Sequence, residues 1–168
     1  MSWRGALIAL GLVLALAVVN FAIVSRERLL AEGEVVLLEL APVDPRSLMQ
    51  GDYMSLRFAI EDDLRSALGD PSWARDAHRD GYAVLALAPD HTVRFVREQA
   101  SSEPVGEGEI ALRYRLRSGE LRIVTNAYFF PEGQAARYEH ARFGELRVGT
   151  DGEALLTRMR AADIRPIE

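Results

Sequence analysis

The feature that most limits how this chain can fold is an uninterrupted apolar segment near its N-terminus. Residues Gly5–Val24 contain one polar side chain, Asn20. At about 1.5 Å rise per residue, a helix of this length spans roughly the 30 Å hydrocarbon core of a bilayer. Arginines flank it on both sides, at Arg4 and at Arg26 and Arg28. We therefore expect a transmembrane helix that is retained as an anchor.

A cleaved signal peptide is the main alternative for this segment. Its apolar core is typically shorter and ends in small residues, whereas this run is long and Phe21–Ser25 is a poor cleavage site. The positive charges on the two sides are nearly balanced, so the short N-terminal tail decides the orientation and favours an exported C-terminal domain. We expect two parts, an anchor with short flanks over residues 1–28 and an extracytoplasmic β-rich domain over residues 29–168.

Composition excludes several kinds of chemistry. The chain has no cysteine and no lysine, and all its basic residues other than histidine are arginine. Disulfides, thiolate metal sites, Schiff-base lysines and Ser-Lys dyads are therefore ruled out. The net charge of −5 argues against nucleic acid as a partner, because binding it requires a concentrated basic patch.

A second constraint comes from Pro42–Phe58. Pro42 and Pro45 force an irregular corner, and Gly51-Asp52 ends it with a turn dipeptide. Beyond the turn the chain alternates between apolar and polar residues as far as Ile60, which predicts a half-buried strand over residues 53–60. Asp52 falls on the apolar side, so we expect turn amides or Arg46 to satisfy its carboxylate.

Short strands separated by turns are predicted for most of the remaining chain. The expected fold is mainly β (α+β), a single transmembrane helix followed by an antiparallel β-barrel or β-sandwich with one or two short helices. Strands 34–40 and 53–60 are expected to be antiparallel neighbours. Further strands are expected at 81–88, 92–97, 110–117, 121–123, 145–148 and 154–159, and helical segments at 61–69, 70–79 and 134–142.

The run Gly51–Phe58 resembles the pattern that names the GDYXXLXY family of bacterial membrane-anchored proteins, with Phe58 where the family has tyrosine. The resemblance extends upstream through Pro42–Arg46 and downstream to Tyr128–Gly133, Tyr138-Glu139 and Phe143–Leu146. It implies a single-span protein of the bacterial inner membrane with a periplasmic domain. It also implies association with a multi-pass membrane protein, and it carries no assigned chemistry or cofactor.

The residues that carry the resemblance are the candidates for partner binding. They are Asp44, Arg46, Gly51, Asp52, Tyr53, Leu56, Phe58, Glu132, Gly133 and Glu139.

Catalytic and metal-binding readings find less support in the sequence. A signal-peptidase-like reaction would need a lysine to activate serine. His78, His91 and His140 lack metal-ligand spacing and are expected to be surface residues. The acids Asp44, Asp52, Glu132 and Glu139 are expected to cap backbone amides or pair with arginine, although their convergence on one site would suit a hydrolase.

Arginines also alternate along one predicted hairpin, at Arg113, Arg115, Arg117 and Arg122. They suit either an anionic surface, such as lipid headgroups, or a solvated sheet face balanced by glutamates on neighbouring strands. The second is the expected arrangement in an acidic protein.

Two functions of different classes are consistent with these patterns. The favoured one is a non-enzymatic accessory subunit or binding domain that docks on a multi-pass membrane protein, in contact with the lipid bilayer. The alternative is an envelope hydrolase or small-ligand-binding protein with a carboxylate site at the Asp44/Asp52 corner. A third possibility is that the corner only determines the fold.

Overall fold

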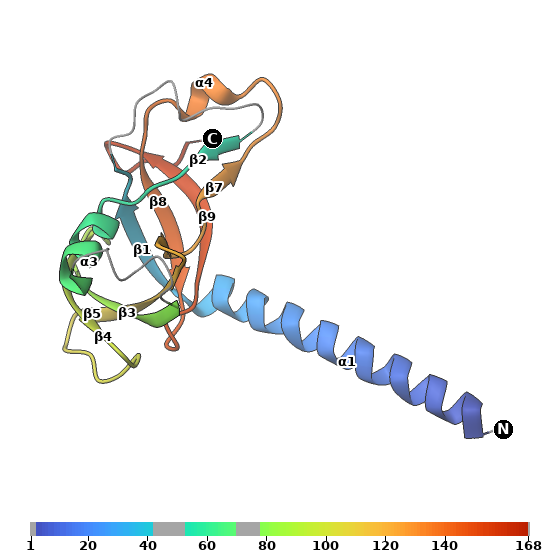
Figure 1. The fold of residues 1–168 in the computed structure, drawn as a ribbon. Coiled ribbons are helices and arrows are strands. Elements are labelled where there is room, and N and C mark those ends of the chain that lie inside the picture. Colours follow the sequence, from blue (N-terminus) through green and yellow to red (C-terminus); the bar gives the residue numbers. More distant parts are fainter. Residues whose placement is uncertain (1–2, 42–52, 70–77, 168) are drawn as a thin grey trace.

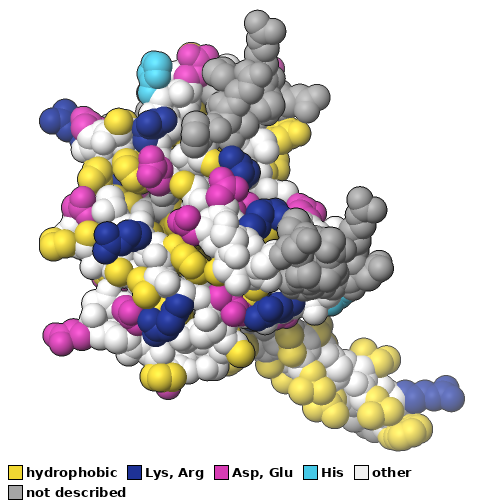
Figure 2. Space-filling view, turned by 60° about the vertical axis from the view of Figure 1, so that its left-hand side comes forward, with side chains coloured by type: hydrophobic (Ala, Val, Ile, Leu, Met, Phe, Trp, Pro, Cys, Tyr) yellow, Lys and Arg dark blue, Asp and Glu magenta, His cyan; other side chains and the backbone are white. Residues whose placement is uncertain are grey.

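The computed structural model describes residues 3–41, 53–69 and 78–167. Its first element, helix α1 (Trp3–Glu32), projects from a β-rich domain (Figure 1). None of its apolar stretch is buried against the described part of the chain, and Figure 2 shows hydrophobic side chains along its length. Among the described residues α1 is the one helix long and apolar enough to cross a membrane, a property that anchors share with signal sequences. It continues four residues past the boundary expected at residue 28.

The first sheet has the order β1-β8-β9, with β1 (Glu34–Glu39), β8 (Ala141–Val148) and β9 (Ala154–Ala161) all antiparallel. Strand β8 lies between the chain's first strand and its last, with Val36 opposite Leu146. The last hairpin was predicted, but its strands are longer than expected. The helix predicted over 134–142 is correspondingly short, because β8 already begins at Ala141 and α4 covers only Ala135–Tyr138.

The second sheet has the order β4-β3-β5-β6. Its strands are β3 (His78–Leu87), β4 (Val93–Gln99), β5 (Glu109–Arg117) and β6 (Glu120–Arg122). The predicted β5–β6 hairpin is confirmed, and both turn residues, Ser118 and Gly119, have positive φ, as a two-residue hairpin turn requires. The helical segment expected to end near Arg79 is wrong at that end, because His78 and Arg79 pair with β5. Residues 70–77 lie outside the described part of the chain.

The two sheets share one hydrophobic core, built from the apolar face of each. Leu37 donates its N–H to His91 O near β4, and Arg113 on β5 donates its N–H to Gly152 O beside β9. These contacts join neighbouring edges, but the described strands do not close into a barrel. The expected mainly β, antiparallel fold is confirmed, and of the two arrangements left open the structure is consistent with the sandwich (Figure 1).

A small third sheet pairs β2 (Tyr53–Ser55) with β7 (Ala127–Phe129). The strand predicted to run to Ile60 is therefore too long, although Met54, Leu56, Phe58 and Ile60 are all buried as the alternation predicts. The chain after Ser55 meets the end of β1 through an antiparallel bridge between Leu40 and Phe58. The expected contact between these two segments thus exists, but as one bridge rather than a ladder.

Helix α3 (Ile60–Leu68) begins where the predicted strand was expected to end. The Glu61 carboxylate accepts a hydrogen bond from the Phe58 N–H at 3.1 Å, and this satisfies a backbone donor ahead of the first turn. Leu64 is fully buried in the shared core. The helix was predicted over 61–69, so its position is confirmed.

Gly81 makes room for Tyr114, the largest fully buried side chain among the described residues. It lies opposite Tyr114 in the β3–β5 register, and a Cβ built on Gly81 would lie 2.7 to 2.8 Å from atoms of the Tyr114 ring and hydroxyl. The Tyr114 hydroxyl donates to Glu98 Oε1 at 2.8 Å, and Arg79 pairs with the same carboxylate at 2.9 Å. The Tyr114 ring therefore fits because Gly81 has no side chain, and its hydroxyl has a hydrogen-bond partner in Glu98.

We expect Gly81→Ala to destabilise the domain by about 1–3 kcal/mol, because the added methyl overpacks a ring that has no room to shift. Thermal unfolding of the full-length protein in detergent measures the effect. Gly11→Ala is the control, since its Cβ meets nothing within 4 Å. Equal melting temperatures for Gly81→Ala and wild type would contradict the close packing of Tyr114 on Gly81.

Candidate functional site

Two of the segments that carry the family resemblance meet in the β2–β7 sheet, and we call them the family segments. They are the described part of Gly51–Phe58 and the segment Tyr128–Gly133. Tyr53 lies opposite Phe129 and Met54 opposite Tyr128. The rings of Tyr53 and Phe129 are in tilted contact, with centroids 5.7 Å apart. Segments about 75 residues apart in the chain therefore form one surface element. Sequence reasoning noticed both segments but had no signal that they would pair.

Phe129 is the most exposed aromatic side chain of this sheet. It is 74% exposed, whereas its neighbour Phe130 is buried and Tyr53 is half-buried. We call the pair of half-buried Tyr53 and exposed Phe129 the aromatic face. Phe129 was not a candidate in the sequence analysis, because local alternation does not say which side of a short, partly covered strand faces solvent.

An aromatic cluster supports this face from the inside. The Tyr138 ring stacks on the Phe130 ring, with centroids 5.0 Å apart, and meets the Tyr128 ring edge-on, with centroids 5.3 Å apart. Burial, with a hydrogen bond to Tyr138, raises the pKa of Tyr128 to about 12. Both effects favour the neutral phenol. Tyr128 therefore stays protonated near neutral pH, and the cluster holds β7 in place.

The other described candidates divide into core and surface residues. Leu56 and Phe58 are buried, with Phe58 only 1% exposed. They therefore cannot contact a partner directly, and they affect partner binding only by stabilising the fold. A Cβ at Gly144 would lie 3.1 Å from the Phe58 ring, so this glycine leaves space for the ring. Phe58 keeps the buried aromatic ring of this position but lacks the hydroxyl group of the tyrosine in the family pattern.

The corner after β7 is a surface turn. Gly133 has φ of +79°, a conformation that glycine adopts without strain, and Glu132 and Glu139 are both exposed. Asp44, Arg46, Gly51 and Asp52 lie outside the described residues. The proposed convergence of carboxylates therefore stays a prediction for them.

The described histidines lie apart from one another. His78, His91 and His140 are all exposed, as expected, and they come from β3, the β3–β4 turn and the segment before β8. In the described residues no group of three His, Cys, Asp or Glu side chains is placed to hold a metal ion.

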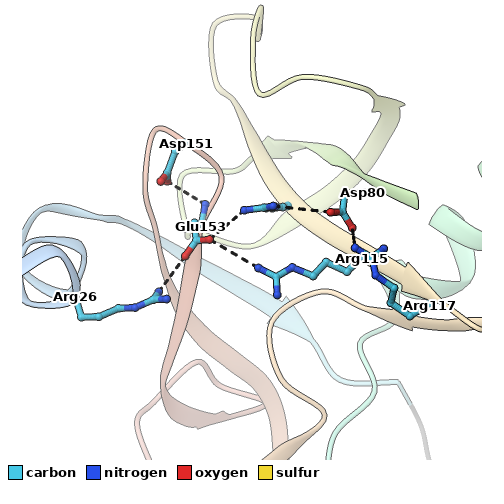
Figure 3. Close-up of polar contacts among 7 residues, drawn as sticks. Arg26, Asp80, Arg115, Arg117, Asp151 and Glu153 are labelled. Atoms are coloured by element: carbon cyan, nitrogen blue, oxygen red, sulfur yellow. Dashed lines mark hydrogen bonds and ion pairs between the residues drawn. The ribbon is translucent and has the colours of Figure 1, made fainter. Parts of the chain in front are cut away.

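We call the alternating arginines of the β5–β6 hairpin the arginine ladder, and its members are Arg113, Arg115, Arg117 and Arg122. Members of this ladder form an ionic network with acids from other elements (Figure 3). Glu153, just before β9, pairs with Arg26 of α1 at 3.1 Å and with Arg113 of β5 at 3.2 Å, and Arg115 lies 4.0 Å from it. Asp80 of β3 pairs with Arg117 at 2.6 Å. Acids from other elements thus balance these arginines, as expected in part, although Asp80 is not a glutamate and Glu153 lies just before its strand.

Arg122 has a closer partner, Glu120 on its own strand, whose oxygens it contacts at 3.0 and 3.2 Å. Arg26 was not a candidate in the sequence analysis. It joins the network because the end of α1 contacts the β8–β9 hairpin. The ladder thus connects the apolar helix to the second sheet.

A groove opens along this network. It has a volume of about 540 Å³ and is lined by four arginines, Arg26, Arg113, Arg115 and Arg122, and by a single acid, Glu153. Phe129 of the aromatic face lines the same groove. We call it the arginine groove.

Two buried carboxylates escaped the sequence analysis. Glu145 of β8 is 3% exposed and is held by Arg158, Arg160 and the Thr157 hydroxyl. Glu61 is 8% exposed, and burial raises its pKa above the ordinary value, partly offset by the Phe58 N–H and by Arg65. For Glu61 the strand-to-helix change beside Phe58 was the signal that a capping acid would be needed there.

The chain was compared with protein families, curated proteins and solved structures. A family model described as GDYXXLXY protein matches residues 15–159, which include the described parts of both family segments. No curated protein and no solved structure matches the chain.

We expect Glu61→Gln to gain stability relative to wild type as pH rises. Below the ordinary carboxyl pKa of about 4.3 the acid is protonated in both the folded and the unfolded state, and burial carries no charge penalty. Above that pH the unfolded state loses its proton first, so wild-type stability falls until the raised folded pKa is passed. Glutamine retains an oxygen to accept the Phe58 N–H and has no charge to bury.

Melting temperatures of both proteins between about pH 4 and pH 8 measure this difference. Asp63→Asn, which removes an exposed charge from the same helical turn, controls for effects on the helix terminus. A difference between Glu61→Gln and wild type that does not change with pH would contradict the assigned burial penalty.

Proposed function

The chain belongs to the GDYXXLXY family, and on that premise we propose that it is a non-enzymatic, membrane-anchored envelope protein that docks on a larger multi-pass membrane protein. In this proposal α1 spans the bacterial inner membrane with its N-terminus inside, and the β-domain lies in the periplasm. The length and exposure of α1 support the anchor, since its apolar side chains need a partner or lipid to cover them.

The observation that carries the docking proposal is the exposure of Phe129 in the sheet where the two family segments meet. Aromatic side chains dominate interface energetics, and a ring held rigidly at the surface loses little entropy when a partner covers it. Tyr53 extends the apolar contact, and the cluster of Tyr128, Phe130 and Tyr138 keeps the strand from shifting.

The position of the aromatic face also suits a membrane partner. Phe129 lines the same groove as Arg26, which lies two residues beyond the apolar run of α1. A multi-pass protein beside α1 would therefore reach the aromatic face close to the membrane surface. For the hydrolase alternative the structure describes only Glu132 and Glu139, which are both exposed at a turn, while Asp44 and Asp52 lie outside the described residues.

We expect the mature protein in native membranes to retain α1. Intact mass should include residues 1–24, and the protein should stay in the membrane fraction during alkaline carbonate extraction, as a transmembrane helix does. A mature N-terminus after the apolar run would instead identify a signal sequence and overturn the anchor.

We expect a photo-crosslinking amino acid at position 129 to capture one multi-pass membrane protein in native membranes. The same amino acid at position 96 is the control, since Val96 is an exposed apolar residue of β4 outside the aromatic face. Phe129→Ser should weaken co-purification of that partner by about 30-fold, which corresponds to an aromatic hot spot of about 2 kcal/mol. Val96→Ser should leave it unchanged.

Equal crosslinking from positions 129 and 96, or co-purification that survives Phe129→Ser, would contradict docking through the aromatic face.

A further inference from the structure

The arginine groove carries an inference beyond docking. Its charged lining is unequal, because Arg26, Arg113 and Arg115 share the carboxylate of Glu153. Two acids next to the lining offset part of this charge, since Asp80 lies 3.9 Å from Arg113 and Glu120 pairs with Arg122. Glu153 is closest to Arg26 and Arg113, so Arg115 is left with only a 4.0 Å contact to it. The Arg115 side chain is 55% exposed. A guanidinium carries five N–H donors, and among the described residues Arg115 has this one ion-pair contact for them.

The groove concentrates this positive charge between apolar walls. Alongside the arginines it is lined by Ile123, Val124, Leu155, Leu156 and Phe129. A cleft with one dominant sign of charge and low-dielectric walls focuses the electrostatic potential toward an incoming anion. Arginine also matches phosphate geometry through paired donors, so a phosphate group is the anion that this lining suits best.

With α1 as a membrane anchor, the groove would open close to the level of the bilayer phosphates. Arg26 lies two residues past the apolar run of α1, a rise of about 3 Å along the helix. The headgroup layer outside the hydrocarbon core is roughly 5–7 Å thick on each side. An arginine-lined opening with apolar walls at this depth fits a phosphate with its attached acyl chains better than a free anion.

We propose that the arginine groove binds the phosphate headgroup of an anionic membrane lipid, with Arg115 and Arg122 as its main contacts from the domain. Arg122 takes part by sharing its donors between Glu120 and the lipid. The proposal rests on the proposed function only in requiring that α1 is a membrane anchor. It does not require a protein partner.

Native mass spectrometry of the full-length protein in nonionic detergent tests this proposal, with phosphatidylglycerol and phosphatidylcholine titrated separately. The wild type should bind phosphatidylglycerol more tightly than phosphatidylcholine. The double variant Arg115→Gln/Arg122→Gln should lose about 30-fold of this affinity, at about 1 kcal/mol for each arginine. Both side chains are more than half exposed, so the variant should fold, and its melting temperature without lipid checks this.

Arg117→Gln is the matched control, because Arg117 belongs to the same strand and ladder but does not line the groove. It should bind phosphatidylglycerol as the wild type does. An equal loss in Arg117→Gln, or equal affinity of the wild type for the two lipids, would overturn the site. Displacement of the lipid by millimolar inorganic phosphate would also overturn it, because it would identify a site for soluble anions.

The same spectra separate this proposal from the proposed function. The intact mass reports whether α1 is present, and the purified protein carries no multi-pass partner. Lipid selectivity without any crosslinked partner would leave the groove assigned and the docking function wrong. A crosslinked partner without lipid selectivity would support the docking function and overturn the lipid site in the groove.

Discussion

The mutual burial of two sheets, each apolar on one face, is the interaction on which the rest of this structure depends. Val36, Leu38 and Leu146 on one sheet and Leu85 and Leu112 on the other are fully buried in one core. Each such side chain contributes about 1.5–3 kcal/mol when it leaves water. The rings of Tyr114 and Phe58 enter this core only because Gly81 and Gly144 have no side chains to obstruct them. The position of β2, and with it the aromatic face, follows from how Phe58 is packed.

The elements that could be predicted from sequence are those whose signal is local. Alternation at Met54, Leu56, Phe58 and Ile60 identified the buried side chains, and the β5–β6 hairpin followed from its turn residues. The same alternation gave the wrong end for the strand. An apolar residue at every second position fits a strand, but it also fits an irregular segment that leads into a helix. The Glu61 cap, which decides between them, acts across three residues.

The candidate site was harder to predict because it depends on distant pairing. The two family segments were recognised, yet the contact of Tyr53 with Phe129 joins strands about 75 residues apart, and no local pattern encodes that register. Burial of Glu145 was missed for the same reason, since its partners Arg158 and Arg160 come from the next strand. The arginine ladder was visible as alternation on β5 and β6. Its connection to Arg26 was not, because that contact requires the helix and the last hairpin to be placed in space.

The connection between α1 and the domain is energetically modest. The pair formed by Arg26 and Glu153 is solvent-exposed, and such pairs contribute about 0–1 kcal/mol. Arg147 adds one hydrogen bond to the Gly33 carbonyl, worth about 1 kcal/mol. If α1 is a membrane anchor as proposed, external contacts of a few kcal/mol would be comparable to these two contacts in setting the orientation of the domain. Phe129 and Arg115 line the same groove, so a partner that covers one changes the surroundings of the other. Lipid and partner protein would then be thermodynamically linked, each altering the affinity of the other by the same factor.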